Sequence, residues 1–181
     1  MSESRRERRL AGKADRKAQK KAEKRNPEPS RLRGLPHREC GSCTACCTAV
    51  GVPELEKPRG TQCSHVCKQG CGIYADRPKS CQVFDCLWKQ GIFEAEHRPD
   101  QLGVVFTVTG QGSVLGRQCV VVHESWPGGF ENARRVLQVL SETQLVILIG
   151  KDASRRLMGP PHLLVEAQRV LNRTLPVLQG S

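Results

Sequence analysis

The sequence predicts an α+β fold, in which a small cysteine-rich unit packs with a β-β-α-β-α unit. Nine of the ten cysteines fall between Cys40 and Cys86, in a region with little periodic structure. Two β-branched runs follow, and an amphipathic helical pattern comes after them. The 181 residues, 38% of them hydrophobic, suit one domain with a modest core and a tail. We divide the chain into residues 1–36, 37–98 and 99–181, the last two belonging to one domain.

The N-terminal arm, residues 1–36, is the main source of the net charge of +11. Residues 1–40 contain 14 Lys/Arg and 6 Asp/Glu, whereas the rest of the chain is close to balanced. Two prolines in residues 26–30 interrupt any helix there. We expect a solvated, disordered or partly helical arm. The alternative is weak contact with nucleic acid or ribosomes through charge, although the arm has no aromatic residue for stacking.

The strands and helices of residues 99–181 follow from hydrophobic periodicity. Residues 103–109 and 118–122 predict a hairpin, with Gly110 and Gly112 between its strands. Residues 145–149 predict a third strand, which Gly150 ends. Two helices are expected, at about residues 131–141 and 161–172. Their apolar stripes are Ala133, Val136, Leu137 and Leu140 in the first and Leu164, Ala167 and Leu171 in the second.

The cellular compartment follows from the lack of apolar segments. No run approaches the roughly 20 residues of a membrane helix, and no apolar stretch follows the basic N-terminus as in a signal peptide. We therefore expect a cytoplasmic protein without membrane contact, and the sequence leaves its oligomeric state open. In a reducing cytosol, clustered cysteines hold metal more often than they form disulfides. A disulfide knot would also leave one of the nine clustered thiols unpaired.

The first cysteine block has the spacing of a metal site. Cys40, Cys43 and Cys46 are separated by two residues each, which lets neighbouring sulfurs turn toward one centre. Bacterial ferredoxins share this spacing, but their fourth cysteine follows after three residues, whereas Cys47 is immediately adjacent. Adjacent side chains point apart. Cys46 and Cys47 therefore serve different ions, or one bridges two ions, or one is only a packing residue.

A second block extends the cluster. Cys63, Cys67 and Cys71 have zinc-compatible C-x3-C spacings, and Cys81 and Cys86 follow. Nine thiols furnish about two four-ligand sites with one to spare. His65 is a candidate nitrogen ligand, although a lone histidine is more often not one. Cys119 lies among valines in a predicted strand, where a small buried hydrophobic residue is the better interpretation.

These blocks resemble those of the bacterial cysteine-cluster proteins, a family described as zinc- or iron-chelating domain proteins. Residues 40–47 match its C-x2-C-x2-C-C signature, and residues 71–88 and Cys63 with His65 look like its later motifs. The resemblance covers about residues 37–150 and leaves Cys67 outside the pattern. Some members are labelled iron–sulfur oxidoreductases. The metal ligands that the resemblance implies are Cys40, Cys43, Cys46, Cys47, Cys63, Cys71, Cys81 and Cys86.

Other residues near the cluster have two interpretations each. Tyr74, Phe84 and Trp88 are expected to shield thiolates from water, with a substrate platform as the alternative. The guanidinium of Arg77 offsets thiolate charge or is a solvated turn residue. His123, at a predicted strand end, is a structural polar residue, or an acid–base group if further evidence supports catalysis.

The sequence therefore predicts a metal-binding protein that chelates zinc or iron through clustered thiolates. The alternative is an iron–sulfur protein with a redox or electron-transfer role. We find no glycine-rich phosphate loop, nucleophile elbow or H-E-x-x-H pair, and we lean against an enzyme without excluding one.

Overall fold

The computed structural model describes residues 35, 37–109 and 118–171. The chain divides into two units, residues 1–35 and 36–181, and the account below concerns the second. The predictions for the basic arm and for the hairpin loop at Gly110–Gly112 lie outside the described residues. The described helices include none that is long and apolar enough to span a membrane.

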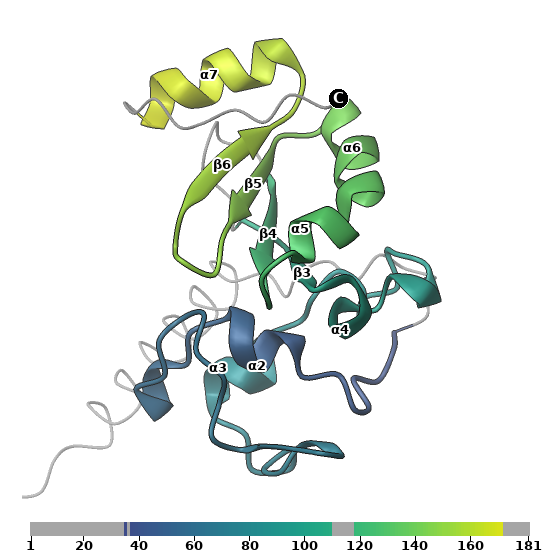
Figure 1. The fold of residues 1–181 in the computed structure, drawn as a ribbon, viewed down its shortest axis with the longest axis vertical. Coiled ribbons are helices and arrows are strands. Elements are labelled where there is room, and N and C mark those ends of the chain that lie inside the picture. The colour runs from purple at the N-terminus through teal and green to yellow at the C-terminus, as the bar shows by residue number, and fades with distance from the viewer. Residues whose placement is uncertain (1–34, 36, 110–117, 172–181) are drawn as a thin grey trace, which may run out of the picture. The chain divides into compact units, whose positions relative to one another are not determined.

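A four-stranded sheet in the order β3-β4-β5-β6 forms the centre of this unit (Figure 1). Strand β4 pairs antiparallel with β3 and parallel with β5, while β5 pairs antiparallel with β6. The parallel pair requires a crossover, which two helices between β4 and β5 provide. The α+β class is confirmed, and the structure adds a strand, β6, that the sequence analysis did not identify. The strands are β3 Val104–Val108, β4 Val120–Glu124, β5 Val146–Ile149 and β6 Arg155–Met158.

One face of the sheet is covered by α5 (Gly129–Asn132) and α6 (Arg134–Thr143). Phe106, Val122 and Leu148, from three adjacent strands, are fully buried in this layer. The apolar stripe expected for this helix faces it: Ala133 and Leu137 are buried, and Val136 and Leu140 pack beside them. The predicted helix is therefore confirmed, although the structure divides it into two.

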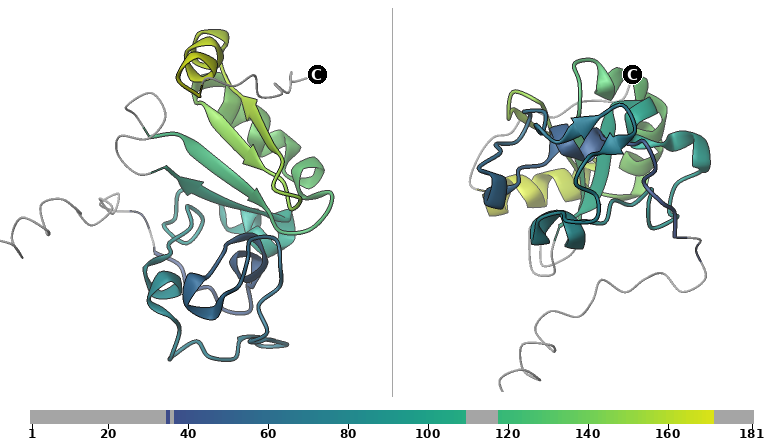
Figure 2. Two further views of the ribbon diagram at one scale, coloured as in Figure 1. Left: turned by 90° about the vertical axis from the view of Figure 1, so that its left-hand side faces the viewer. Right: turned by 90° about the horizontal axis from the view of Figure 1, so that it is seen from below.

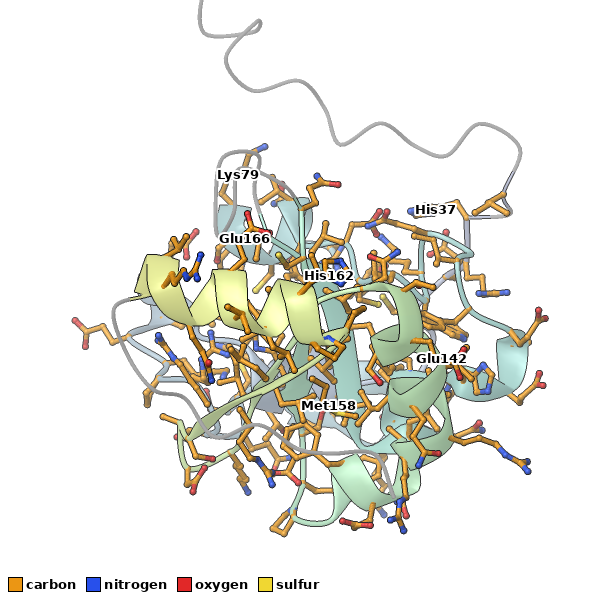
Figure 3. All side chains as sticks on the ribbon, turned by 90° about the horizontal axis from the view of Figure 1, so that it is seen from above. His37, Lys79, Glu142, Met158, His162 and Glu166 are labelled. Atoms are coloured by element: carbon orange, nitrogen blue, oxygen red, sulfur yellow. The ribbon has the colours of Figure 1, made fainter. Side chains whose placement is uncertain are left out.

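The opposite face is covered in part by α7 (Pro161–Leu171). Leu163 and Ala167 of this helix pack with Leu145, Leu157 and Cys119. Cys119 is 1% exposed, which confirms its interpretation as a buried hydrophobic residue. Figure 3 looks down on α7 and labels its exposed residues His162 and Glu166.

The cysteine-rich region packs on that same opposite face, next to β3. Val105 of β3 is fully buried against Ala45 and Ala49 of α2 (Ala45–Ala49). Figure 2 shows this region as a loop-rich part beside the sheet, built from short elements. They are the 3-10 helices η1 (Pro53–Leu55) and η2 (Ala95–His97), the strands β1 (Val66–Cys67) and β2 (Gly70–Cys71), and the helices α3 (Lys79–Val83) and α4 (Pro99–Leu102).

Helix α3 is short. It ends at Val83, because Phe84 takes an extended conformation with φ −74° and ψ 120°. The chain then runs to the sheet, where the Leu87 N–H donates a 2.9 Å bond to the Phe106 carbonyl. This bond anchors Cys86, the residue before Leu87, beside β3.

Candidate metal centre

A cavity of about 90 Å³ lies within the cysteine-rich region. Four separate segments bring cysteines to its wall: residues 40–47, the loop around residue 63, the β1–β2 hairpin, and residues 81–86. Every cysteine predicted as a ligand lines this one cavity: Cys40, Cys43, Cys46, Cys47, Cys63, Cys71, Cys81 and Cys86.

The first block is arranged by α2 and the turn before it. The Cys43 N–H donates to the Cys40 carbonyl at 3.0 Å, which closes a turn around Gly41. Cys46 and Cys47 lie in the first turn of α2, the helix that is anchored to β3 through Ala45 and Ala49. All four cysteines of this block line the cavity.

The second block is joined to the first by main-chain contacts. The Cys63 N–H donates to the Cys47 carbonyl at 3.0 Å, and the Gly60 N–H donates to the Thr48 carbonyl at 3.0 Å. Cys71 lies on β2 of the small hairpin. These contacts hold the loop that carries Cys63 against the end of α2.

Glu54 positions the helix that carries Cys81. Its carboxylate accepts hydrogen bonds from the Ser80 backbone N–H at 2.8 Å and from the Ser80 hydroxyl at 2.6 Å. The first of these bonds satisfies a backbone N–H in the first turn of α3, where N–H groups have no partner within the helix. Cys81 follows Ser80 directly, so this contact helps to fix its backbone.

Three other candidate residues do not line the cavity. Cys67 is exposed, in agreement with its poor fit to the family pattern. His65 lies in the hairpin region but not in the cavity wall, and Cys119 belongs to the core under α7. The aromatic residues expected near the cluster, Tyr74, Phe84 and Trp88, are all part of the wall. All ten cysteines are free thiols.

The cavity wall is largely apolar, and burial in it changes the pKa of the cysteine thiols. Val50, Val52, Leu55, Ile73 and Val105 line it beside the aromatic residues. Burial disfavours the charged thiolate. It raises the pKa of the Cys40 and Cys86 thiols, and it raises the pKa of the Cys43 thiol to about 11. A metal ion must therefore displace protons from these thiols.

Backbone N–H groups partly offset the effect of burial on the pKa of two of these thiols. The N–H of Ala45 donates to Cys43, and the N–H groups of Trp88 and Lys89 donate to Cys86. Hydrogen bonds to sulfur stabilise the thiolate form and orient the side chain. These N–H groups therefore favour the thiolate forms of Cys43 and Cys86.

Cys46 and Cys47 interact directly. The hydrogen bond between their thiols raises the pKa of Cys46, which burial raises further, and the same bond lowers the pKa of Cys47. Lys57 and Arg77 lower the pKa of Cys47 further. The pair therefore favours a thiolate at Cys47, which the charges of Lys57 and Arg77 also stabilise.

Lys57 is a buried lysine that the sequence analysis did not identify. It is 8% exposed, and among the described residues no carboxylate forms an ion pair with it. Its ammonium donates to carbonyl oxygens of Val50 at 2.6 Å, Thr61 at 2.8 Å, Pro58 at 3.1 Å and Thr48 at 3.5 Å. The acidic groups that interact with it most strongly are the thiols of Cys63, Cys47, Cys46 and Cys81.

Two other cations, Arg77 and Lys89, line the cavity itself. The Arg77 guanidinium stacks 3.7 Å over the Tyr74 ring and interacts with Cys40 and Cys47. Lys89, also in the wall, interacts with Cys40 and forms a 3.2 Å ion pair with Asp85. This arrangement is consistent with the interpretation that the guanidinium of Arg77 offsets thiolate charge.

His123 is occupied by structural hydrogen bonds. Its Nδ1 accepts a bond from the Arg59 guanidinium, and its Nε2 lies 3.1 Å from the Thr107 hydroxyl, which in turn donates to the Val121 carbonyl. Burial, reinforced by the charge of Arg59, lowers the pKa of His123 to about 4. The imidazole is therefore neutral near pH 7. It joins strand β4 to Arg59 through a hydrogen bond, which is a structural role.

Within residues 37–109 and 118–171, no three His, Cys, Asp or Glu side chains are arranged so that they could hold a metal ion. Comparisons with protein-family models, curated proteins and solved structures found no match. The resemblance to the cysteine-cluster family, and metal binding itself, stay predictions.

Proposed function

We propose that this protein binds zinc or iron through the eight cysteines of the cavity. The observation that supports this most is selective convergence: eight cysteines from four segments line one cavity, while Cys67 and Cys119 do not. Thiolate sulfur is a preferred ligand of Zn²⁺ and of iron–sulfur clusters. The C-x2-C-x2-C-C spacing supports membership of the bacterial cysteine-cluster family. The need for free thiols supports a reducing, cytoplasmic location.

Cations close to the cysteines favour thiolates over thiols. Lys57 is a buried ammonium without a carboxylate partner among the described residues, and the acidic groups that act on it most strongly are four cysteines. Burying an unpaired charge is costly, so ionisation of these thiols on metal binding supplies the missing anion. In this proposal the residues bind and neutralise the metal, and no catalytic step is assigned.

An iron–sulfur cluster is the second candidate, and the size of the cavity favours it. About 90 Å³ is several times the 10–15 Å³ that one water molecule requires. A cluster of iron and sulfide would use this space, and the apolar wall would limit solvent access to it.

Elemental analysis and absorption spectroscopy test the proposal and separate its two forms. The full chain is purified without oxygen or chelators, together with Cys43→Ser and the matched control Cys67→Ser. A colourless protein with about two zinc ions supports zinc chelation, and a brown protein absorbing near about 400 nm supports an iron–sulfur cluster. Cys43→Ser should lose metal and Cys67→Ser should retain it. Equal metal content in all three proteins, or none in the wild type, would overturn the proposal.

A further inference from the structure

We propose that the eight cysteines form two separate four-thiolate sites, and that the adjacent residues Cys46 and Cys47 belong to different sites. This inference rests on the proposed function and specifies how the ligands divide. The first thiolate site consists of Cys40, Cys43, Cys46 and Cys86. The second thiolate site consists of Cys47, Cys63, Cys71 and Cys81.

Three of the four members of the first site share one packing cluster. Cys43, Cys46 and Cys86 pack together against the buried residues Ala45, Ala49 and Val105. Cys40 joins them through the turn that its carbonyl closes with the Cys43 N–H. In addition, Cys40 and Cys43 both interact with Cys46, and Cys40 interacts with Cys86. The site therefore lies against the sheet, between α2 and the segment after α3.

The members of the second site are linked by contacts of their own. The backbone bond from Cys63 to Cys47 places these two residues side by side. The cysteines that interact most strongly with Cys81 are Cys47, Cys63 and Cys71. None of these four belongs to the cluster packed on Val105. This site therefore lies among α2, the hairpin and α3, away from the sheet.

The helix explains why a pair of adjacent cysteines can serve two sites. Successive residues of an α-helix point about 100° apart around its axis. Cys46 packs in the cluster on β3, whereas Cys47 is not part of that cluster and its carbonyl accepts the hydrogen bond from the Cys63 N–H. The hydrogen bond between their thiols shows that the two sites touch at this pair.

The cations are distributed between the two sites in a matching way. A divalent ion with four thiolates carries a net charge of about −2. Lys89 interacts with Cys40 of the first site, and Lys57 interacts mainly with members of the second. Arg77 interacts with one cysteine of each, Cys40 and Cys47. Each site therefore has its own cation and shares a third.

Pulsed alkylation of the wild-type full chain tests the division without any substitution. The zinc-loaded protein is treated with increasing chelator, alkylated briefly with N-ethylmaleimide at each step, and mapped by peptide mass spectrometry. We expect two sets of four cysteines, each modified as a unit, with Cys46 and Cys47 in different sets. Modification of all eight as one set, or Cys46 and Cys47 in the same set, would overturn the division. If chelator changes nothing because no zinc was bound, the proposed function fails first.

Double substitutions provide a second measurement, with zinc counted by native mass spectrometry. Cys43→Ser combined with Cys86→Ser should leave one ion per chain, because both belong to the first site. Cys43→Ser combined with Cys81→Ser should leave none, whereas Cys67→Ser should keep two. Equal zinc content in the two double variants would contradict the division. Poor folding of a variant leaves the wild-type alkylation pattern as the deciding result.

Discussion

The backbone N–H of Cys63 donates a 3.0 Å hydrogen bond to the carbonyl oxygen of Cys47. The two cysteine blocks are therefore joined by main chain as well as by their shared cavity. Cys71 and Cys81, in contrast, lie on a short hairpin and a five-residue helix. The helix that carries Cys81 is also held by a side-chain contact from Glu54, and this contact can be tested by substitution.

Glu54→Ala should weaken metal binding at the second thiolate site. The substitution removes both hydrogen bonds to Ser80 and releases the start of the helix that carries Cys81. Loss of an outer contact of this kind costs about tenfold in affinity. Zinc competition with a chromophoric chelator measures it, and Glu56→Ala removes the same charge from an exposed neighbour as the control. Equal affinities in both variants would show that Glu54 does not position Cys81.

Lys57→Met should destabilise the protein and reduce its metal affinity. Methionine fills similar space but leaves the carbonyls of Val50 and Thr61 without their charged donor. We expect a loss of about 2 kcal/mol or more in the free energy of unfolding, measured by urea denaturation. If Lys57 neutralises thiolates, the loss is larger with zinc bound than without it. Lys68→Met, at an exposed position, is the control. An equal loss with and without zinc would show that Lys57 does not neutralise thiolates.

His123 should make the fold less stable as the pH falls below 6.5. Its pKa is about 4 in the folded chain, against an ordinary value of 6.5, so the unfolded chain binds a proton in this interval and the folded chain does not. Stability from the neutral imidazole is complete above pH 6.5 and falls by roughly 3 kcal/mol on approaching pH 4. The measurement is urea denaturation of wild type and His123→Gln at several pH values. The difference between the two should shrink as the pH falls, and a constant difference would contradict this assignment.

Gly129→Ala should disrupt the contact between α5 and the end of α4. A Cβ at residue 129 would overlap the carbonyl oxygen of Gly103, which has φ +80° and ends α4. Overpacking of this kind costs about 1–3 kcal/mol. Gly128→Ala is the matched control, because its Cβ would meet no atom within 4 Å and only the positive φ of 89° opposes it. Thermal denaturation should show the larger loss for Gly129→Ala, and the reverse order would contradict the close approach.

The predicted elements that the structure confirms are those with a strong periodic signal. The helix stripe from Ala133 to Leu140 and the strand of residues 145–149 were predictable because each has one long apolar face. Strand β6 was not, since it begins with Arg155 and Arg156, and charged residues are typical of an edge strand. Pairing with β5, rather than its own pattern, makes this segment a strand.

The candidate site was likewise predictable only in part from the sequence. Spacing and resemblance together selected the eight cysteines that line the cavity and left Cys67 doubtful. The role of Lys57 was not predictable, because a lysine between Glu56 and Pro58 is typical of a solvated turn. Its burial arises only when carbonyls from residues 48–61 close around the ammonium. The partnership of Arg59 and His123, 64 residues apart, depends likewise on tertiary contacts.

X-ray absorption spectroscopy of the metal-loaded full chain tests the central claim most directly, because it identifies the atoms that bind the metal. If the eight thiolates are the ligands, the zinc-loaded protein has a first shell of sulfur alone, at about 2.3 Å. An iron-loaded protein should likewise show sulfur neighbours. A zinc first shell of nitrogen or oxygen atoms at about 2.0 Å would contradict the claim that these cysteines hold the metal.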